Sequence, residues 1–497
     1  MSDSLKSTVL TGVIWNTIAR FGQQLLQFGF SVVLARLLVP EDFGLITMMM
    51  VFAGFVTMLS DAGLGAALVH KQHLEERHIQ TSFWSNVVIG VVLTALAWLI
   101  APWLAEFYKT PELKNVIRLW SVSFIIINAG MVPEALLMKR MRFAVLARVS
   151  LMVVGVSGAV GVVMAYAGWG VWSLVVQSVS ASFLSTVLLW SIARFLPRRV
   201  FEKQALSELV HYGRGLLGFS FINYWARNAD SLLIGRAFGS AELGLYGRAY
   251  SLMLLPITQV ISVFAKVMFP ALSSIQNDRV RIKRIYLRAN GMIALFSFPL
   301  MIGLIVTAGP FINTLYGPKW EGVVPLIRIL AVTGIAQSLL NPTGWLYTSL
   351  GKTNWLFWWG VGAGVTLIGS IIVGVILGSV QWVAVCYTAA NLVLLLPGLA
   401  IPGSLIGMTI RDLFLTIKGP VGAAIVMGIV VAAVHAALPA TLSSWVQLVI
   451  LVTIGVLFYW SAVFGLRMQV AMDALSILRE KLDENRSDHR VTDSVVP

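Results

Sequence analysis

The sequence contains little charge. Only 12% of its 497 residues are Asp, Glu, Lys or Arg, whereas a soluble domain carries about 25%. A chain so poor in charge cannot cover its own surface in water, and lipid is the solvent that suits the 58% of hydrophobic residues. Acids are the scarcer charged type, which leaves a formal net charge of +14. In a soluble protein that excess would indicate nucleic-acid binding, but here it belongs in loops or an internal cavity, so no nucleic-acid partner is expected.

Cysteine and catalytic motifs are also scarce. Cys386 is the only cysteine, which excludes an intrachain disulfide. There is no complete G-x-x-x-x-G-K-[ST] phosphate loop that would indicate an ATP-driven engine. The run from His73 to His78 fails the H-x-x-E-H zinc motif because position 77 is Arg77. We expect those histidines on a solvated loop. No outer loop is long enough for a catalytic domain, so we predict no catalytic residues, metal, cofactor or enzymatic activity.

Long hydrophobic runs are what the sequence has in abundance. A helix needs about 20 largely apolar residues to cross a bilayer, and the chain has about fourteen such runs. Runs such as residues 87–93 do not alternate every second residue, as strands of a membrane barrel would. We therefore predict an all-α polytopic membrane protein with spans near 11–35, 43–63, 82–104, 115–137, 144–166, 169–193, 209–235, 243–269, 287–312, 323–347, 354–377, 380–402, 412–436 and 444–466.

The distribution of Lys and Arg predicts the orientation. With the N-terminus inside, most loop cations fall in the inner loops, and the outer loops hold only Arg36, Lys109, Lys114, Arg236 and Lys319. Positive residues favour the cytoplasmic side of a membrane. We therefore expect a bacterial cytoplasmic-membrane protein with both termini in the cytoplasm and an even number of spans.

The chain also repeats itself. Residues 33–45 read VLARLLVPEDFGL and residues 233–245 read LIGRAFGSAELGL, so Arg36 corresponds to Arg236 and Gly44 to Gly244. A weaker match pairs IRLWSV at 117–122 with IRILAV at 327–332. An even number of spans separates the copies, so both insert in the same direction, as in two-lobed carriers. We predict two pseudo-symmetric six-helix lobes at 1–200 and 201–405, a trailing helix pair at 406–467 and a cytoplasmic tail at 468–497.

Several stretches resemble a known family. They are LARLLVPEDFGLITM at 34–48, LSDAGLGAALVHKQ at 59–72, FWSN at 83–86, LYGRAYSLMLLPITQVISVFAKVMFPALSSIQND at 245–278 and GPKWEGVVPLIRILAV at 317–332. They are similar to the polysaccharide transport family of the multidrug/oligosaccharidyl-lipid/polysaccharide (MOP) exporter superfamily, which includes the colanic-acid exporter and O-antigen-unit flippases. The resemblance implies fourteen helices and a substrate, an undecaprenyl-diphosphate-linked oligosaccharide moved to the outer leaflet. It also allows contact with membrane lipids and other polysaccharide-assembly proteins.

Charges inside the predicted spans are the candidates for a substrate site, because a charge at mid-bilayer is costly and usually faces a cavity or a partner. Polar positions 16, 20, 23, 24 and 27 share one face of the first span. The seventh span, its repeat equivalent, carries a similar stripe, so we expect the two stripes to face each other. Arginine offers a diphosphate a bidentate fork. The predicted substrate-binding set is Arg20, Gln24, Arg227, Asp230, Arg248, Lys266 and Arg328.

Structural interpretations of these residues stay open. Arg227 and Asp230 are three residues apart and can form a purely structural ion pair. Arg248 and Lys266 lie on one face of a span, although Arg248 can instead meet outer headgroups. Ion coupling could use Asp61 or Asp230, but Asp61 can also cap a turn, and a potential-driven or uncoupled cycle fits equally well.

Three functions therefore compete. A lipid-linked oligosaccharide flippase working by alternating access accounts for the repeat, the surplus of cations and the resemblance. An ion-coupled exporter of small cationic drugs would need acidic groups in its cavity, whereas here bases predominate. A membrane polysaccharide polymerase would need a sizeable outer loop, which the sequence lacks.

Overall fold

The computed structural model describes residues 21–60, 68, 71, 74–204, 206–208, 217–439, 441–468 and 471–472. Every regular element among them is a helix. Twelve of these helices are long and apolar enough to cross a membrane, which confirms an all-α polytopic membrane protein. The described residues form two compact units, divided between Gly247 and Arg248.

The first unit contains a helix at residues 21–37 and five complete helices. These five are α2 (Pro40–Ser60), α4 (Glu76–Phe107), α5 (Leu113–Lys139), α6 (Phe143–Tyr166) and α7 (Val171–Ala193). The unit also includes the beginning of α9 (Leu217–Ser274), a helix that continues into the second unit.

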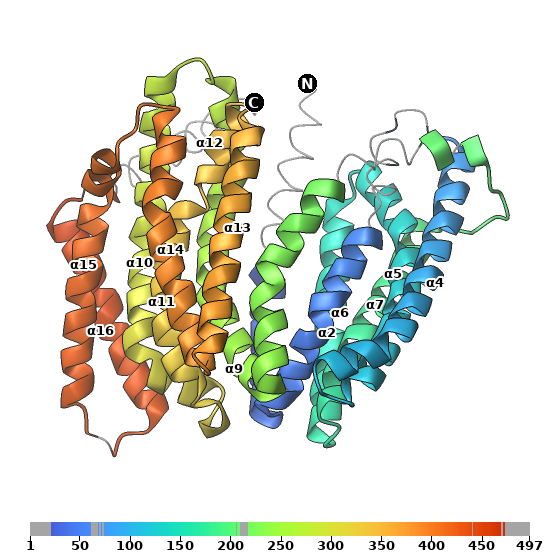
Figure 1. Cartoon of the computed structure of the whole chain (residues 1–497), viewed down its shortest axis with the longest axis horizontal. Helices are drawn as coiled ribbons and strands as arrows, with labels where there is room; N and C mark the ends of the chain where they lie inside the picture. Colours follow the sequence, from blue (N-terminus) through green and yellow to red (C-terminus); the bar gives the residue numbers. More distant parts are fainter. Residues whose placement is uncertain are drawn as a thin grey trace, which may run out of the picture. The chain divides into compact units, whose positions relative to one another are not determined.

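The second unit holds the remainder of α9 and the helices that follow it. They are α10 (Arg279–Leu315), the 3-10 helix η2 (Pro318–Trp320), α11 (Val323–Leu340), α12 (Thr343–Ser349), α13 (Thr353–Ile376), α14 (Val380–Ser404), α15 (Ile410–Ala437) and α16 (Ser444–Gly465). Figure 1 shows the helices of both units, with α13 and α14 side by side.

The difference between fourteen predicted spans and twelve observed ones has two causes. The first predicted span begins outside the described residues, and only its 21–37 portion is seen as helix. The predicted spans 209–235 and 243–269 both lie in α9, where two helices meet across a kink at Gly239 and are counted together. The structure also interrupts one predicted span internally. The Asn341-Pro342 pair divides one predicted span into α11 and α12, because proline removes a backbone donor and clashes with the preceding turn.

Helix α5 occupies the centre of the first unit, where it packs against α2, α4 and α7. Where α5 packs against α7, indole N–H groups donate hydrogen bonds to backbone and side-chain oxygens. Trp190 donates to the carbonyl oxygen of Ala129 at 2.9 Å, and Trp120 donates to the hydroxyl of Ser178 at 2.9 Å. Such bonds matter in a bilayer, because hydrocarbon offers buried polar groups no alternative partner.

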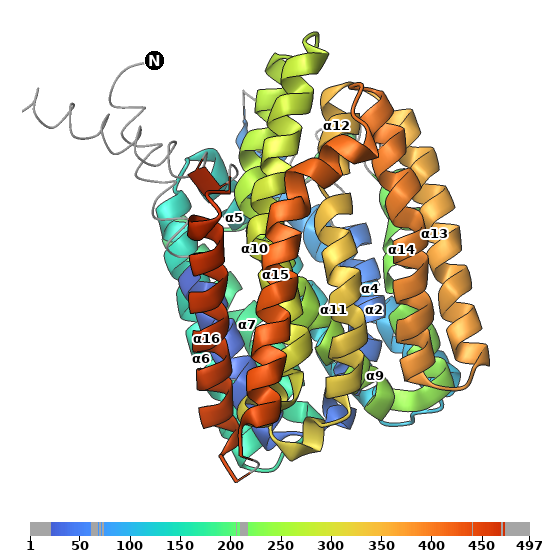
Figure 2. The same ribbon diagram turned by 90° about the vertical axis from the view of Figure 1, so that its left-hand side faces the viewer.

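Helix α10 has the corresponding role in the second unit. It packs against α11, α15 and α16, and Figure 2 shows α15 and α16 beside it. Leu295 of α10, Met427 of α15 and Val463 of α16 contribute to one buried apolar cluster. The hydroxyl of Tyr459 donates to the carbonyl oxygen of Leu295 at 2.7 Å. The trailing helix pair, which has no counterpart in the sequence repeat, is thus docked on α10.

The sequence repeat corresponds to a shared local structure, a helix, a break and a second helix. In the first copy, the helix at 21–37 ends and α2 begins at Pro40. In the second copy, α9 is interrupted at Gly239, whose φ of 85° and ψ of −174° are accessible essentially only to glycine. Position 239 corresponds to Val39 at the repeat offset, so the two breaks coincide.

Candidate substrate-translocation site

The two copies of the repeat contact each other within the first unit, where the start of α2 meets α9 just after Gly239. A Cβ atom added to Gly44 would lie 1.8 Å from the carbonyl oxygen of Ser240. A Cβ atom added to Gly244 would lie 2.0 Å from the carbonyl oxygen of Pro40. These pairs exchange when the two copies are exchanged, since 44 corresponds to 244 and 40 to 240. An approximate two-fold axis between the segments requires this reciprocity.

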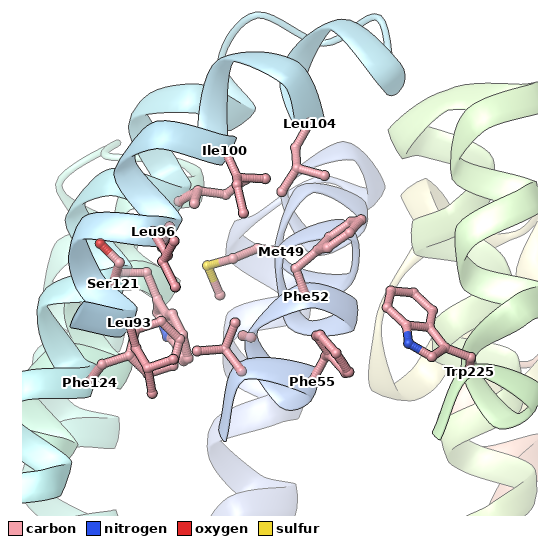
Figure 3. Close-up of a pocket in the computed structure, with 15 residues that line it drawn as sticks. Met49, Phe52, Phe55, Leu93, Leu96, Ile100, Leu104, Ser121, Phe124 and Trp225 are labelled. Carbon is pink, nitrogen blue, oxygen red and sulfur yellow. The ribbon is translucent and has the colours of Figure 1, made fainter. Parts of the chain in front are cut away.

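An apolar cavity of about 340 Å³ lies beside this contact, between α2, α4, α5 and α9. Figure 3 shows Trp225 of α9 directed toward it from one side, opposite Leu93 and Leu96 of α4. Ser121 is the one polar residue in the described lining, which also contains Met49, Phe52, Phe55, Ile100 and Phe124. Such a cavity can accommodate hydrocarbon but offers a diphosphate neither charge nor enough donors.

Aromatic packing fixes this part of α9 against α2. The ring centroids of Phe55 and Trp225 are 5.1 Å apart, and those of Phe55 and Tyr224 are 6.0 Å apart. The hydroxyl of Tyr224 donates to the carbonyl oxygen of Val51. Gly54 leaves space for this contact, because a Cβ atom there would lie 2.5 Å from the Tyr224 hydroxyl. The aromatic residues thus position one wall of the cavity.

Asp230 is the predicted site residue that the structure describes most fully. Its side chain is buried, with 7% of the residue exposed. One carboxylate oxygen accepts a hydrogen bond from the Ser231 backbone N–H at 2.6 Å, and the Tyr246 side chain faces the carboxylate. The ion pairs among the described residues do not include Asp230. A buried acid at membrane depth usually has a functional or a pairing role.

Several predicted site residues lie outside the description. Arg20 and Asp61 are not among the described residues, and the side chains of Arg227 and Lys266 on α9 are not described either. Gln24 is half-buried on the helix at 21–37. It lies about 120° around the helix from Phe30, because the six residue steps between them advance by about 100° each. Phe30 packs against Gly158 of α6, so Gln24 is on a different face of the helix, and the facing of the two polar stripes remains a prediction.

Arg248 and Arg328, two of the predicted cations of the second unit, occupy separate places. The Arg248 guanidinium lies over the rings of Tyr316 and Trp320, 5.9 Å and 6.0 Å from their centroids, so aromatic rings hold it near η2. Arg328 is exposed and lines a shallow groove with His435 of α15. Within this unit the structure does not bring Arg248 and Arg328 into one site.

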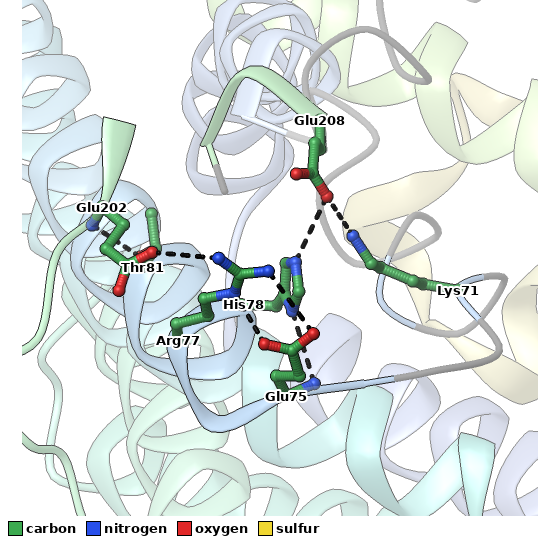
Figure 4. A network of polar contacts seen from close by, with 7 residues as sticks. All are labelled: Lys71, Glu75, Arg77, His78, Thr81, Glu202 and Glu208. Carbon is green, nitrogen blue, oxygen red and sulfur yellow. Dashed lines mark hydrogen bonds and ion pairs between the residues drawn. The ribbon is translucent and has the colours of Figure 1, made fainter. Parts of the chain in front are cut away.

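One sequence expectation was wrong. His78 is not on a solvated loop but fully buried in the first turn of α4. Its Nδ1 accepts from the Glu75 N–H at 3.3 Å, and its Nε2 lies 3.3 Å from a carboxylate oxygen of Glu208. Figure 4 shows Glu208 bridging His78 and Lys71. The segment after α7 covers His78 and brings Glu208 into contact with it. Local sequence could not reveal this burial, because the two residues are far apart in the chain. His73 lies outside the described residues.

The same network fastens the segment after α7 to the beginning of α4. The Arg198 N–H donates to the side-chain oxygen of Gln80 at 2.7 Å, and the Glu202 N–H donates to the Thr81 hydroxyl at 3.0 Å. Trp84 donates to the carbonyl oxygen of Arg198 at 2.8 Å. Sequence reasoning missed this attachment as well as the apolar cavity. The only available signal for the α2–α9 contact was the glycine common to both repeat copies.

Three comparisons with known proteins bear on this arrangement. The chain is 27% identical over 429 residues to the teichuronic acid biosynthesis protein TuaB of Bacillus subtilis (strain 168), covering 86% of this chain and 89% of that protein. It is 28% identical over 375 residues to the succinoglycan biosynthesis transport protein ExoT of Rhizobium meliloti (strain 1021), covering 75% of each. The structure matches the lipid II flippase MurJ in an inward closed conformation, with a TM-score of 0.73 and 16% identity.

The structural match covers 91% of this chain and 99% of that flippase, so the two share a fold. Residues 33–325, more than half of the chain, match the family described as polysaccharide biosynthesis protein. The matched region includes both copies of the repeat and the reciprocal glycine contact. This multi-pass membrane protein is therefore a member of the polysaccharide biosynthesis protein family.

Proposed function

We propose that the protein is a flippase that moves undecaprenyl-diphosphate-linked oligosaccharide repeat units across the bacterial cytoplasmic membrane by alternating access. In this proposal both termini are cytoplasmic, the protein catalyses no chemical step, and the product enters exopolysaccharide, capsule or O-antigen synthesis. Family membership supports the polysaccharide assignment. The names of relatives support transport, since one is a succinoglycan biosynthesis transport protein and one structural neighbour is a lipid II flippase.

The observation that carries the alternating-access part is the reciprocal contact of Gly44 and Gly244. In carriers built from repeats, alternating access is largely a rocking of one repeat against the other around the binding site. At Gly44 and Gly244 the nearest groups across the contact are backbone atoms, and such a glycine contact lets two helices change their crossing angle with little repacking. The glycines thus supply a pivot of the kind that such a cycle needs.

The diphosphate is assigned to arginine side chains of the first unit. Arg20 and Arg227 remain the proposed phosphate ligands, and Gln24 the proposed hydrogen-bonding partner on the same helix as Arg20. A carrier that binds a dianion at membrane depth needs compensating cations, because desolvated charge is costly without a partner. Arg248, Lys266 and Arg328 are retained in the proposal as further cations on the route.

Reconstituted vesicles provide the test. A fluorescent undecaprenyl-diphosphate oligosaccharide is placed in one leaflet, and its arrival in the other is followed by a membrane-impermeant quencher. We expect Arg20→Ala and Arg227→Ala to lower the translocation rate by about tenfold or more, the effect of about 1.4 kcal/mol of lost interaction. Arg148→Ala is the matched control, because Arg148 is exposed on α6. Wild-type protein that moves no labelled lipid would contradict the function, whereas wild-type rates in both variants would contradict only the assigned ligands.

A second candidate is an ion-coupled exporter of small cationic molecules. The burial of Asp230 favours it, because a buried carboxylate attracts cations. Asp230→Asn separates the two functions. Under the drug-exporter hypothesis it abolishes efflux of a cationic dye from vesicles. Under the flippase hypothesis the wild-type protein exports no such dye, and the variant changes at most the ion dependence of lipid translocation.

A further inference from the structure

A second cavity, of about 520 Å³, lies within the second unit, between the beginnings of α10 and α15 and the end of α16. These helix ends are on the side that the distribution of Lys and Arg predicts to be cytoplasmic. Its lining combines apolar and basic side chains, namely Arg284, Leu287, Arg288 and Met292 of α10, Leu415 and Lys418 of α15, and Leu466, Arg467 and Met468 after α16. The cavity contains none of the residues predicted to bind substrate and none from the repeated stretches.

The charge of this cavity is entirely positive. Arg284, Arg288, Lys418 and Arg467 come from three different elements, and none of the described lining residues is acidic. The acid at the same end of α15, Asp412, is already engaged. It pairs with Lys283 at 2.6 Å and accepts from the Thr409 N–H at 2.8 Å, where it completes the helix cap. Among the described residues, Arg284, Lys418 and Arg467 form no ion pair.

The polarity of the lining changes along the helix axis as it does along a lipid. Arg284, Arg288 and Met292 are spaced by four residues and share one face of α10. The two arginines lie nearer the helix end and the methionine one turn deeper. A phospholipid has the same order, a phosphate at the membrane surface and hydrocarbon below it. A soluble anion, in contrast, has no hydrocarbon that could contact the apolar part of the lining.

Arg467 is held at the rim by an unusual backbone. It follows α16 with a φ of 43°, in the left-handed region that usually holds glycine at a helix end. Its N–H donates to the carbonyl oxygen of Phe464, and the Met468 N–H donates to that of Val463. This is the hydrogen-bond pattern of a Schellman cap. An arginine in a conformation that suits glycine strains the backbone, and this strain occurs where cationic side chains are concentrated.

We propose that this cavity binds the phosphate headgroup of an anionic membrane lipid, such as phosphatidylglycerol. The guanidinium groups of Arg284, Arg288 and Arg467 and the Lys418 ammonium contact the phosphate oxygens. Leu287, Met292 and Leu415 contact the first carbons of the acyl chains. Basic pockets between membrane helices on the cytoplasmic side suit such headgroups, and charge-assisted bonds to phosphate are the strong ones. The site is separate from the proposed translocation path, because all its residues belong to α10, α15 and the end of α16.

The experiment measures phosphatidylglycerol binding to the purified full-length chain by native mass spectrometry in a mild detergent. We expect Arg284→Gln combined with Arg288→Gln to weaken binding by about tenfold or more, which corresponds to about 1.4 kcal/mol. The matched control is Arg279→Gln combined with Arg281→Gln, which removes two exposed cations from the same helix outside the cavity. The control should bind phosphatidylglycerol as the wild type does. Equal binding by all three proteins would overturn the proposal.

Arg467→Gly keeps the proposal testable if the double variant fails to fold. Glycine suits the left-handed conformation at position 467, so this variant should fold at least as well as the wild type. We expect it to lose phosphatidylglycerol affinity while its thermal unfolding temperature is unchanged or raised. Loss of stability without loss of lipid would contradict the assigned role of Arg467.

Competition identifies the source of the phosphate. Inorganic phosphate and phosphatidylcholine should displace little phosphatidylglycerol, because the first lacks hydrocarbon and the second lacks net negative charge. Complete displacement by inorganic phosphate would overturn the lipid assignment in favour of a simple anion site. Preferential binding of undecaprenyl diphosphate would overturn it in favour of a substrate site.

Discussion

At the scale of single residues, Glu208 is the group whose titration has a structural consequence. Hydrogen bonds from Lys71 and then from His78 lower its pKa below the ordinary 4.5. The Nδ1 of His78 accepts from Glu75, so the neutral ring carries its proton on Nε2 and donates it to Glu208. This carboxylate links the segment after α7 to the beginning of α4.

The sign of the resulting pH dependence follows from the direction of the shift. Because the folded pKa of Glu208 is below the unfolded one, its stabilisation is complete above 4.5 and is lost as the pH falls through the lowered pKa. Hydrogen exchange at the Arg198 and Glu202 amides, corrected for intrinsic rates, should therefore accelerate as the pH falls below about 4.5. Glu208→Gln should remove most of this dependence, whereas Glu202→Gln, which also removes a carboxylate from the segment, should retain it. An identical pH response in Glu208→Gln and the wild type would contradict the mechanism.

Gly239 is a second residue whose role is local. Its φ of 85° with an extended ψ is essentially closed to other residues. We expect Gly239→Ala to destabilise the protein by about 1–3 kcal/mol, measured as a lowered unfolding temperature in detergent. Gly303→Ala is the control, because Gly303 is inside α10 with open space around its Cα and alanine favours the helix. Equal unfolding temperatures for Gly239→Ala and the wild type would show that the break tolerates a side chain.

At the scale of elements, the close approach of α2 and α9 depends on two glycines. A methyl group at Gly44 or at Gly244 would collide with a backbone carbonyl rather than with a movable side chain. We expect Gly44→Ala and Gly244→Ala each to separate the helices, to cost about 1–3 kcal/mol of stability and to slow lipid translocation severalfold. The measurements are thermal unfolding and the vesicle assay.

Gly247→Ala is the control for this pair. It lies on the same segment of α9, and its added Cβ would meet Thr47 at an ordinary 3.5 Å. This variant should translocate lipid at the wild-type rate. If Gly244→Ala were as active as Gly247→Ala, the reciprocal contact would have no part in transport.

The existence of most elements could be predicted because apolar runs and their length suffice to define membrane helices. The predicted gap between the first two spans, at residues 36–42, contains the observed break at 38–39, and α2 begins at Pro40, a residue that suits a helix start. The predicted break between spans 209–235 and 243–269 is also present, as the kink at Gly239 within α9. The sequence could not place this break at a particular residue, because hydropathy carries no information about φ and ψ.

At the scale of the whole molecule, the orientation in the membrane is open to a direct test. Cys386 is the only cysteine, so Cys386→Ala gives a background without thiols. Single cysteines at Thr110, Glu321 and Ser443 should react with a membrane-impermeant maleimide in intact cells, because they are in predicted outer loops. Cysteines at Lys352 and Arg198 should react only after permeabilisation, because Lys and Arg are retained on the cytoplasmic side. The opposite labelling pattern would reverse the predicted topology.

The sequence by itself determined that this chain is an all-α membrane protein with an internal repeat, and its resemblance pointed to the right family. Composition and hydropathy are additive properties of residues, so they can be read without knowing what each residue contacts. The repeat can also be identified from the sequence alone, because the chain is compared only with itself. The predicted cationic site belongs to a different class, since it depends on where side chains point. Within the described residues, Asp230 is buried and Arg248 and Arg328 occupy separate places, so the cationic site stays a prediction.

The tertiary structure alone decided which residues meet. It buried His78 under a segment over a hundred residues away in the chain, set Gly44 against Ser240, and gathered Arg284, Lys418 and Arg467 at one cavity. Each of these contacts joins residues that are distant in the sequence. Their proximity results from helix packing. Local sequence does not distinguish a cation on an exposed surface from a cation in a cavity. The energy of a charge depends on its surroundings, and the fold rather than the sequence pattern supplies them.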